Sequence, residues 1–214
     1  MSENKGYKII ALVALLLGVV GVTLGYAAFS STLTVNSTAE VKPDSNTFNV
    51  DFSSSSSAVE TNAIVPTLSD ATIDGFSATN ATIDNTSDPV ISNLKATFTA
   101  PGQSVTYNFY SYNAGEFIGY LNSIVYSGEK TCTAKTGTTQ SYVDSACTGI
   151  SLSIKVGSES VTTTSVTGIT NHTLGIGASE PITVTITYAA NSAVADGDFD
   201  VTFPSIVLTY DSAD

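Results

Sequence analysis

The stretch that decides the fold class reads Ile182-Thr-Val-Thr-Ile-Thr-Tyr188, in which every second residue is apolar and every residue between is threonine. Successive side chains of a β-strand point to opposite faces, so this pattern turns one face toward a core and leaves the other to water. Thr and Val also favour strands over helices. The stretch therefore predicts a half-buried strand of an antiparallel sheet.

The same alternation recurs along the chain, separated by turn signals such as Pro101-Gly102 and Ala195-Asp196-Gly197. After Phe203 the apolar phase shifts across Pro204-Ser205, which predicts a bulge or a change of sheet. Further strands are predicted at 48–52, 94–98, 105–109, 117–126, 150–156, 199–203 and 206–210. Strands of this number and length indicate an all-β fold, an antiparallel β-sandwich with either jelly-roll or immunoglobulin-like Greek-key connections.

An apolar run precedes the strands and extends from Ile9 to Ala28, long enough to cross a bilayer as a helix. Lys5 and Lys8 lie before it, so the amino end is expected in the cytoplasm and the rest of the chain outside the membrane. We therefore expect residues 1–28 to be a signal peptide or a membrane anchor. Residues 29–214 are expected to be a single β-sandwich domain that is extracellular or held at the cell surface.

Removal and retention of the export segment both remain open from the sequence. Ala27 and Ala28 supply small residues for cleavage by a signal peptidase, but the apolar run is longer than a usual signal segment. If the segment is retained, it is the expected contact with the membrane.

The charge balance excludes one class of partner. The chain of 214 residues carries 7 basic residues, all lysines, against 19 acidic ones, for a net charge of −12. Such a surface repels phosphate backbones, so we expect no nucleic acid partner.

A long alternating stretch follows the export segment directly. From Phe29 to Val41 the even positions are all polar, and the odd positions supply the apolar residues Phe29, Leu33, Val35, Ala39 and Val41. Thirteen residues extend about 43 Å as a strand, roughly twice the usual length. Two interpretations stay open: the strand is donated to the sheet of a neighbouring subunit, or it pairs within its own domain.

Two other segments interrupt the strand pattern. Cys132 and Cys147 bracket a polar stretch, and in an exported chain they predict a disulfide-closed loop over 132–147. Residues 53–89 have few apolar anchors and begin with a serine run at 53–57. This segment is predicted to be a polar insertion with two weak strands.

No pattern points to an enzyme, a metal or a cofactor. His172 is the only histidine, so a Ser-His-Asp triad, a Cys-His pair or a histidine zinc site has no basis in the sequence. Asp196, Asp198 and Asp200 alternate, but the glycine and distal glutamate of a calcium loop are missing. These aspartates are interpreted as a solvated turn.

Two stretches resemble the TasA/camelysin family of exported matrix proteins. One is the junction Gly25-Tyr-Ala-Ala-Phe-Ser-Ser-Thr-Leu-Thr34, and the other runs from Asn93 through Pro101-Gly102 to Phe109, followed by Asn113-Ala-Gly115. The resemblance implies cleavage near the Ala-Phe junction and a jelly-roll subunit that polymerises by passing its N-terminal strand to a neighbour. The metalloprotease activity attributed to camelysin-type members has no H-E-x-x-H support in this chain.

These features lead to two hypotheses. The first is a structural protein of a prokaryotic cell surface, a fibre or biofilm-matrix subunit that self-associates by N-terminal strand donation. The alternative is a membrane-tethered adhesin or carbohydrate-binding sandwich, with Tyr110 and Tyr112 as a stacking platform.

Overall fold

In the computed structural model, the described residues are 14–15, 48–126, 128–161, 166–167, 169 and 172–212. The candidate donor strand 29–41, the candidate cleavage residues Ala27 and Ala28, and all of the predicted export segment except residues 14 and 15 lie outside this set. Among the described residues there is no helix of the length and apolar character needed to cross a membrane.

The described residues between 48 and 212 form antiparallel sheets, and the predicted all-β class is confirmed. The elements are β1 (Val50–Ser53), β2 (Thr67–Leu68), β3 (Ser77–Ala78), β4 (Thr82–Asp84), β5 (Val90–Ser92), β6 (Lys95–Phe98), β7 (Ser104–Asn113), β8 (Gly119–Tyr126), β9 (Thr131–Ala134), α2 (Gln140–Cys147), β10 (Ile150–Val156), β11 (Glu159–Val161), β12 (Val166–Thr167), β13 (Thr173–Leu174), β14 (Ser179–Tyr188), β15 (Phe199–Thr202) and β16 (Ile206–Ser212).

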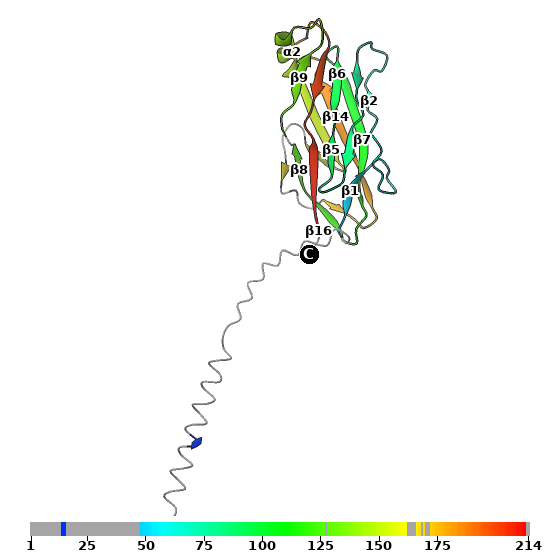
Figure 1. Ribbon diagram of the computed structural model, residues 1–214, viewed down its shortest axis with the longest axis vertical. Helices are drawn as coiled ribbons and strands as arrows, with labels where there is room; N and C mark the ends of the chain where they lie inside the picture. Colours follow the sequence, from blue (N-terminus) through cyan, green and yellow to red (C-terminus); the bar gives the residue numbers. More distant parts are fainter. Residues whose placement is uncertain are drawn as a thin grey trace, which may run out of the picture. The chain divides into compact units, whose positions relative to one another are not determined.

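The strands make a sandwich-like pair of layers (Figure 1). The first layer is one sheet in the order β1-β7-β14-β10-β11, with β2 following β1 along the same edge of β7. The other layer contains a sheet in the order β12-β8-β16-β5-β4, with β13 also on β8, and a sheet in the order β3-β6-β15-β9. The chain crosses between the layers at β2–β3, β6–β7, β7–β8, β9–β10, β11–β12, β13–β14 and β14–β15.

The two sheets of the second layer lie end to end, because consecutive strands of the chain pair in the same order on both sides of an interruption. β5 and β6 are consecutive, β15 and β16 are consecutive, and the two pairs are neighbours in both sheets. The break between β15 and β16 falls at Pro204, so the phase shift in the sequence marks a change of sheet, as one of its two interpretations predicted. Proline cannot donate a ladder hydrogen bond, which explains the interruption there.

Side chains satisfy the backbone groups that this interruption leaves open. Asn93 has a φ of 60°, a left-handed conformation that asparagine tolerates better than most residues. Its Nδ2 donates to the Asn80 carbonyl at 2.8 Å. From the opposite sheet, the Tyr107 hydroxyl donates a shared hydrogen bond to the carbonyl oxygens of Thr79, at 3.1 Å, and Lys95, at 3.2 Å. The break is therefore held by bonds that cross the core.

The core between the layers consists of the apolar positions that alternation selected. On β14, Ile182, Val184, Ile186 and Tyr188 are all buried, while the threonines between them are partly exposed. Aromatic rings pack across the layers, with the centroids of Phe98 and Tyr188 5.9 Å apart. Such packing is the expected stabilising force for a sandwich of this size.

Residues 53–89 run along one side of the domain and supply β2, β3 and β4. A bridge between Ile64 and Ala81 ties the segment together, and both residues are buried. Phe76 is also buried and stacks on Phe98. Ile64, Phe76 and Ala81 therefore attach this polar segment to the core.

We predict that Tyr107→Phe lowers the free energy of unfolding by about 1–2 kcal/mol, because the hydroxyl bonds to the Thr79 and Lys95 carbonyls are lost while the ring still fills its site. The Lys95 carbonyl keeps its bond from the Thr79 N–H in this variant. Equilibrium urea denaturation measures this loss. Tyr120→Phe is the matched control, because Tyr120 is 37% exposed. We expect this variant to change the free energy of unfolding by no more than about 0.5 kcal/mol. Equal stability of the two variants would contradict the cross-layer role of the hydroxyl.

Candidate assembly surfaces

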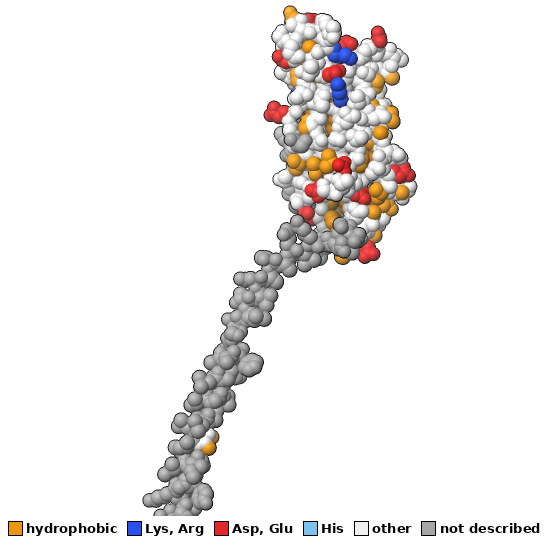
Figure 2. Space-filling view, viewed as in Figure 1, with side chains coloured by type: hydrophobic (Ala, Val, Ile, Leu, Met, Phe, Trp, Pro, Cys, Tyr) orange, Lys and Arg blue, Asp and Glu red, His pale blue; other side chains and the backbone are white. Residues whose placement is uncertain are grey.

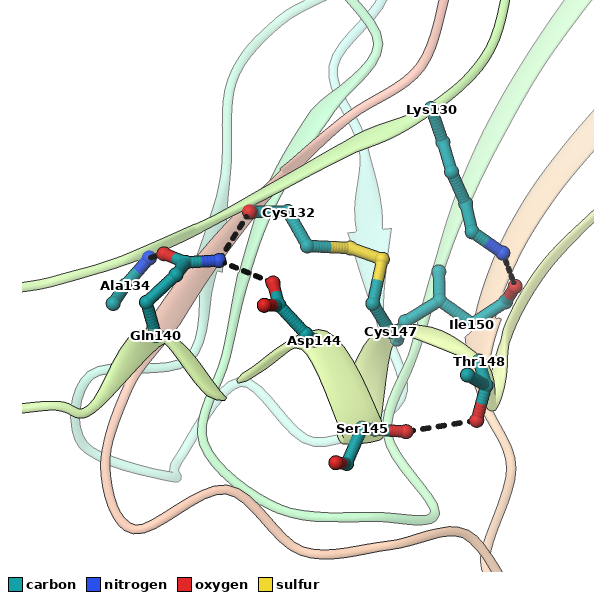
Figure 3. Close-up of a disulfide and its surroundings, with 9 residues drawn as sticks. All are labelled: Lys130, Cys132, Ala134, Gln140, Asp144, Ser145, Cys147, Thr148 and Ile150. Atoms are coloured by element: carbon teal, nitrogen blue, oxygen red, sulfur yellow. Dashed lines mark hydrogen bonds between the residues drawn. A yellow bond between two sulfur atoms is a disulfide. The ribbon is translucent and has the colours of Figure 1, made fainter. Parts of the chain in front are cut away.

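The predicted disulfide is present and joins β9 to the last residue of α2 (Figure 3). The Cα atoms of Cys132 and Cys147 are 6.1 Å apart, an ordinary span for a disulfide. Beside it, Gln140 Nε2 donates to the Cys132 carbonyl at 3.1 Å, and Gln140 Oε1 accepts from the Ala134 N–H at 2.8 Å. The bracketed stretch is therefore a fixed cap on one end of the domain.

The helix in this cap was not predicted from the sequence. Its side toward the domain presents only Val143 and Ala146, which are both buried. The Thr139 N–H, just before the helix, donates to Asp196 Oδ1 at 2.9 Å. The available signal in the sequence was that two apolar residues, Val143 and Ala146, lie three positions apart. A pattern of only two residues does not distinguish a helix from a polar loop.

We predict that the double variant Cys132→Ala and Cys147→Ala loses about 3 kcal/mol of stability, because a closed loop with a sequence separation of 15 no longer restricts the unfolded chain. Thermal unfolding with and without reductant measures the effect. Reductant should lower the Tm of the natural chain and leave that of the double variant unchanged. A natural chain insensitive to reductant would contradict the prediction.

A groove opens on the side of the sandwich where β10 faces the break between β8 and β9. It has a volume of about 340 Å³ and mixes apolar with polar lining. The lining residues are Tyr126, Gly128, Glu129, Lys130, Ile150, Ser151, Leu152, Phe203 and Pro204. We call it the seam groove, because it lies between the edges of the two layers.

One wall of the seam groove is a strand edge. The Ala189 N–H donates to the Gly149 carbonyl, and hydrogen-bonded pairs alternate along an antiparallel ladder, so Ile150 and Leu152 direct their backbone groups away from β14. In the described residues β11 pairs with β10 only from Ile154 onward, so no described strand lies beside these two residues. Lys130 Nζ donates to the Ile150 carbonyl at 2.5 Å, and burial lowers the pKa of Lys130.

The opposite edge of the first sheet is closed in a different way. Beyond β1, the Phe52 N–H donates to Asn85 Oδ1 at 3.0 Å, and Asn85 Nδ2 donates to the Phe52 carbonyl at 2.8 Å. The asparagine amide thus reproduces the pair of bonds that a neighbouring strand would make. A second groove of about 380 Å³ lies nearby, lined by Phe48 to Val50, Asn85 to Pro89 and Tyr210. Sequence reasoning missed these roles of Asn85 and Lys130, because each side chain bonds to a backbone group far away in the sequence.

The tyrosines proposed as a stacking platform lie on the outer face of β7. Tyr110 and Tyr112 are both half-buried there. The serine run crosses this face, since Ser53 Oγ donates to the Ala58 carbonyl and Ser179 Oγ to the Ser56 carbonyl. Ser53 is paired with Tyr110, and Ser179 with Tyr112, on either side of β7. The platform therefore lacks the open face that ring stacking on a sugar requires.

A chain of polar side chains crosses the core near the other end of the domain. His172 Nε2 lies 2.6 Å from Glu180 Oε2, and the Tyr210 hydroxyl donates to Glu180 Oε1 at 2.8 Å and lies 2.8 Å from Ser111 Oγ. Burial, reinforced by the charge of Glu180, holds the pKa of Tyr210 well above its usual value. Ser111 and His172 stand at opposite ends of this chain of contacts, so it connects the layers without pairing a nucleophile with a base.

Two of the three alternating aspartates, Asp196 and Asp200, have separate partners. Asp196 accepts from Thr139, whereas Asp200 accepts from Lys95 at 2.9 Å and from Thr97 at 2.7 Å. Burial raises the pKa of Asp200, but the hydrogen bonds and charge of Lys95, with Thr97, outweigh it and hold the pKa below its usual value. On the face in Figure 2, lysines lie toward the α2 end, and uncharged polar surface predominates.

No protein-family model matches the chain, and comparison with curated proteins and with solved structures finds no significant match.

We predict that alkaline pH destabilises the fold through buried tyrosines. Burial raises the pKa of Tyr107 and of Tyr126 to about 12, whereas an unfolded tyrosine has a pKa of about 10. The folded chain thus keeps protons that the unfolded chain releases, so their stabilisation is complete below about pH 10 and is lost as pH rises through about 12. Tyrosinate absorbance should show a late step that is smaller in the double variant Tyr107→Phe and Tyr126→Phe, in which Tyr210 still ionises late. The prediction would be contradicted if all tyrosines ionised in a single step near pH 10 while the chain kept its native circular dichroism.

Proposed function

We propose that the chain is an exported structural protein of a prokaryotic cell surface, a fibre or biofilm-matrix subunit in which residues 29–41 of one copy pair with the sheet of the next. The observation that carries the proposal is the seam groove, where a crevice with apolar and polar lining lies beside the edge of β10 at Ile150 and Leu152, which no described strand pairs. Strand addition requires these two features together, because the backbone gives affinity and the crevice takes alternate side chains.

The alternation of the donor segment suits such a groove. Its odd positions, among them Leu33 and Val35, would enter between the layers, while the polar even positions face water. Lys130 covers the Ile150 carbonyl, and charged lysines are a common protection of strand edges against unwanted pairing. Its partial burial favours displacement, since the ammonium regains solvation when a backbone N–H replaces it.

We further infer that the connections are immunoglobulin-like rather than jelly-roll. Labelling β1, β7, β8, β10, β14 and β16 as A to F in chain order gives A-B-E-D in one layer and C-F in the other, which is the Greek-key order. The position of the last strand, G, is taken by β5 and β6. Cleavage after the export segment by a signal peptidase belongs to the same proposal.

We predict that Leu33→Asp with Val35→Asp abolishes assembly, because two charges would have to enter the seam groove. Thr34→Asp with Asn36→Asp is the matched control: it adds the same charge to the same segment on the outward phase, and should still give fibres. Negative-stain microscopy and sedimentation of the protein recovered from the producing cell's surface measure both, and intact mass verifies equal export and processing.

Two outcomes would overturn the proposed function. One is equal assembly of the two charge variants, since a donated strand must distinguish its faces. The other is an intact mass that retains Met1 to Tyr26 in isolated membrane particles, which would indicate a tethered binding module.

A further inference from the structure

Three exposed apolar side chains gather at the end of the domain opposite α2. Phe117 is 43% exposed, Ile118 42% and Ile176 59%. They belong to the β7–β8 connection and the β13–β14 connection, residues 114–118 and 175–178, which we together call the Asn113 tip. Apolar side chains in such a group on an otherwise polar surface indicate an interaction site.

The tip is rigid because Asn113, which is fully buried, bonds to both connections. Its Nδ2 donates to the carbonyls of Phe117 at 2.8 Å and Leu174 at 3.0 Å. Its backbone N–H donates to the Ala178 carbonyl, and its carbonyl accepts from the Gly177 N–H, both at 2.9 Å. A buried amide with these bonds fixes the loops before any partner arrives, which lowers the entropic cost of docking.

The tip also lies where the N-terminal segment reaches the domain. The Asn49 carbonyl accepts from the N–H groups of Ala114 and Gly115 at 2.9 and 3.0 Å. Only residues 42–47 separate Val41 from Phe48, so the end of the donor segment is at most about 25 Å away. Any copy that receives residues 29–41 must therefore stand close to this tip.

We propose that the Asn113 tip docks against the α2 end of the same second copy that receives the donor strand. This inference rests on the proposed function and names a second contact for it. The seam groove lies at the start of β10, near α2. A donated strand that binds there would place the Asn113 tip of the donating copy near the α2 end of the receiving copy. The receiving end exposes Tyr142, at 55%, and Val194, at 64%. The contact joins two different surfaces, which produces open filaments rather than closed dimers.

A lipid surface is the less suitable occupant. Glu116 is exposed within the tip, and the chain as a whole carries −12, so anionic headgroups would be repelled. A second copy offers uncharged aromatic and aliphatic contacts instead.

To test this proposal, the full-length chain that carries both Phe117→Ser and Ile176→Ser is exported by its host cell, and its assembly is compared with that of the natural chain. We expect an unchanged Tm, because both side chains are exposed, and a critical concentration for fibres raised at least about tenfold. Val65→Ser is the matched control, since Val65 is 71% exposed on the β1–β2 connection, and it should leave assembly unchanged. Unchanged assembly of the Phe117→Ser and Ile176→Ser variant would overturn this inference. If the two pairs of charge variants in residues 29–41 still differ in assembly, the proposed strand donation is unaffected by that result.

Cross-linking identifies the occupant. The two native cysteines are paired, so an introduced cysteine is the only free thiol. Phe117→Cys and Tyr142→Cys chains, mixed and assembled under oxidising conditions, should give heterodimers, and neither should give homodimers alone. Homodimers of Phe117→Cys would show a tip-to-tip contact and overturn the proposal. So would cosedimentation with phosphatidylcholine vesicles that requires Phe117 and Ile176.

Discussion

The hydrogen bond from the Tyr107 hydroxyl to the carbonyls of Thr79 and Lys95 resolves the main difficulty of this fold. One layer of the sandwich is interrupted between β5 and β6 and between β15 and β16, and backbone groups at such a break need partners outside the ladder. The Tyr107 hydroxyl is such a partner, although the Lys95 carbonyl also accepts from the Thr79 N–H. A tyrosine from the intact layer reaches these groups without displacing the apolar core around it. The breaks at Asn93 and Pro204 then lie at the same level, while the ladder between β7 and β14 in the other layer continues without interruption.

The strands and the disulfide were predictable because each depends on a local pattern. A half-buried strand requires only alternation, which Ile182 to Tyr188 shows without exception. The interruption was foreseen only at Pro204, since proline is the one residue there that cannot continue a ladder. Asn93 looks like an ordinary turn residue, and its left-handed conformation is decided by the strands beside it.

The candidate surfaces were harder to predict because their residues act through distant partners. Asn113 was visible as part of a turn, but its bonds to Leu174 join segments far apart in the sequence. Asn85 and Lys130 matter only because one lies beyond β1 and the other beside β10. The helix α2 is stable where it is because the disulfide and Asp196 hold its two ends, which no helical pattern in Gln140 to Cys147 would suggest.

The two edges of the first sheet differ in a way that gives the proposed fibre a direction. At β1 the edge is closed by an amide that is part of the fold, whereas at the start of β10, in the described residues, a lysine covers the Ile150 carbonyl and is proposed to give way to a donated strand. Each subunit then accepts at one edge only, so a filament has one end with an empty acceptor and another with an undonated strand. A cell that exports subunits one at a time could extend such a filament from a single end, with its oldest subunit always farthest from the point of addition.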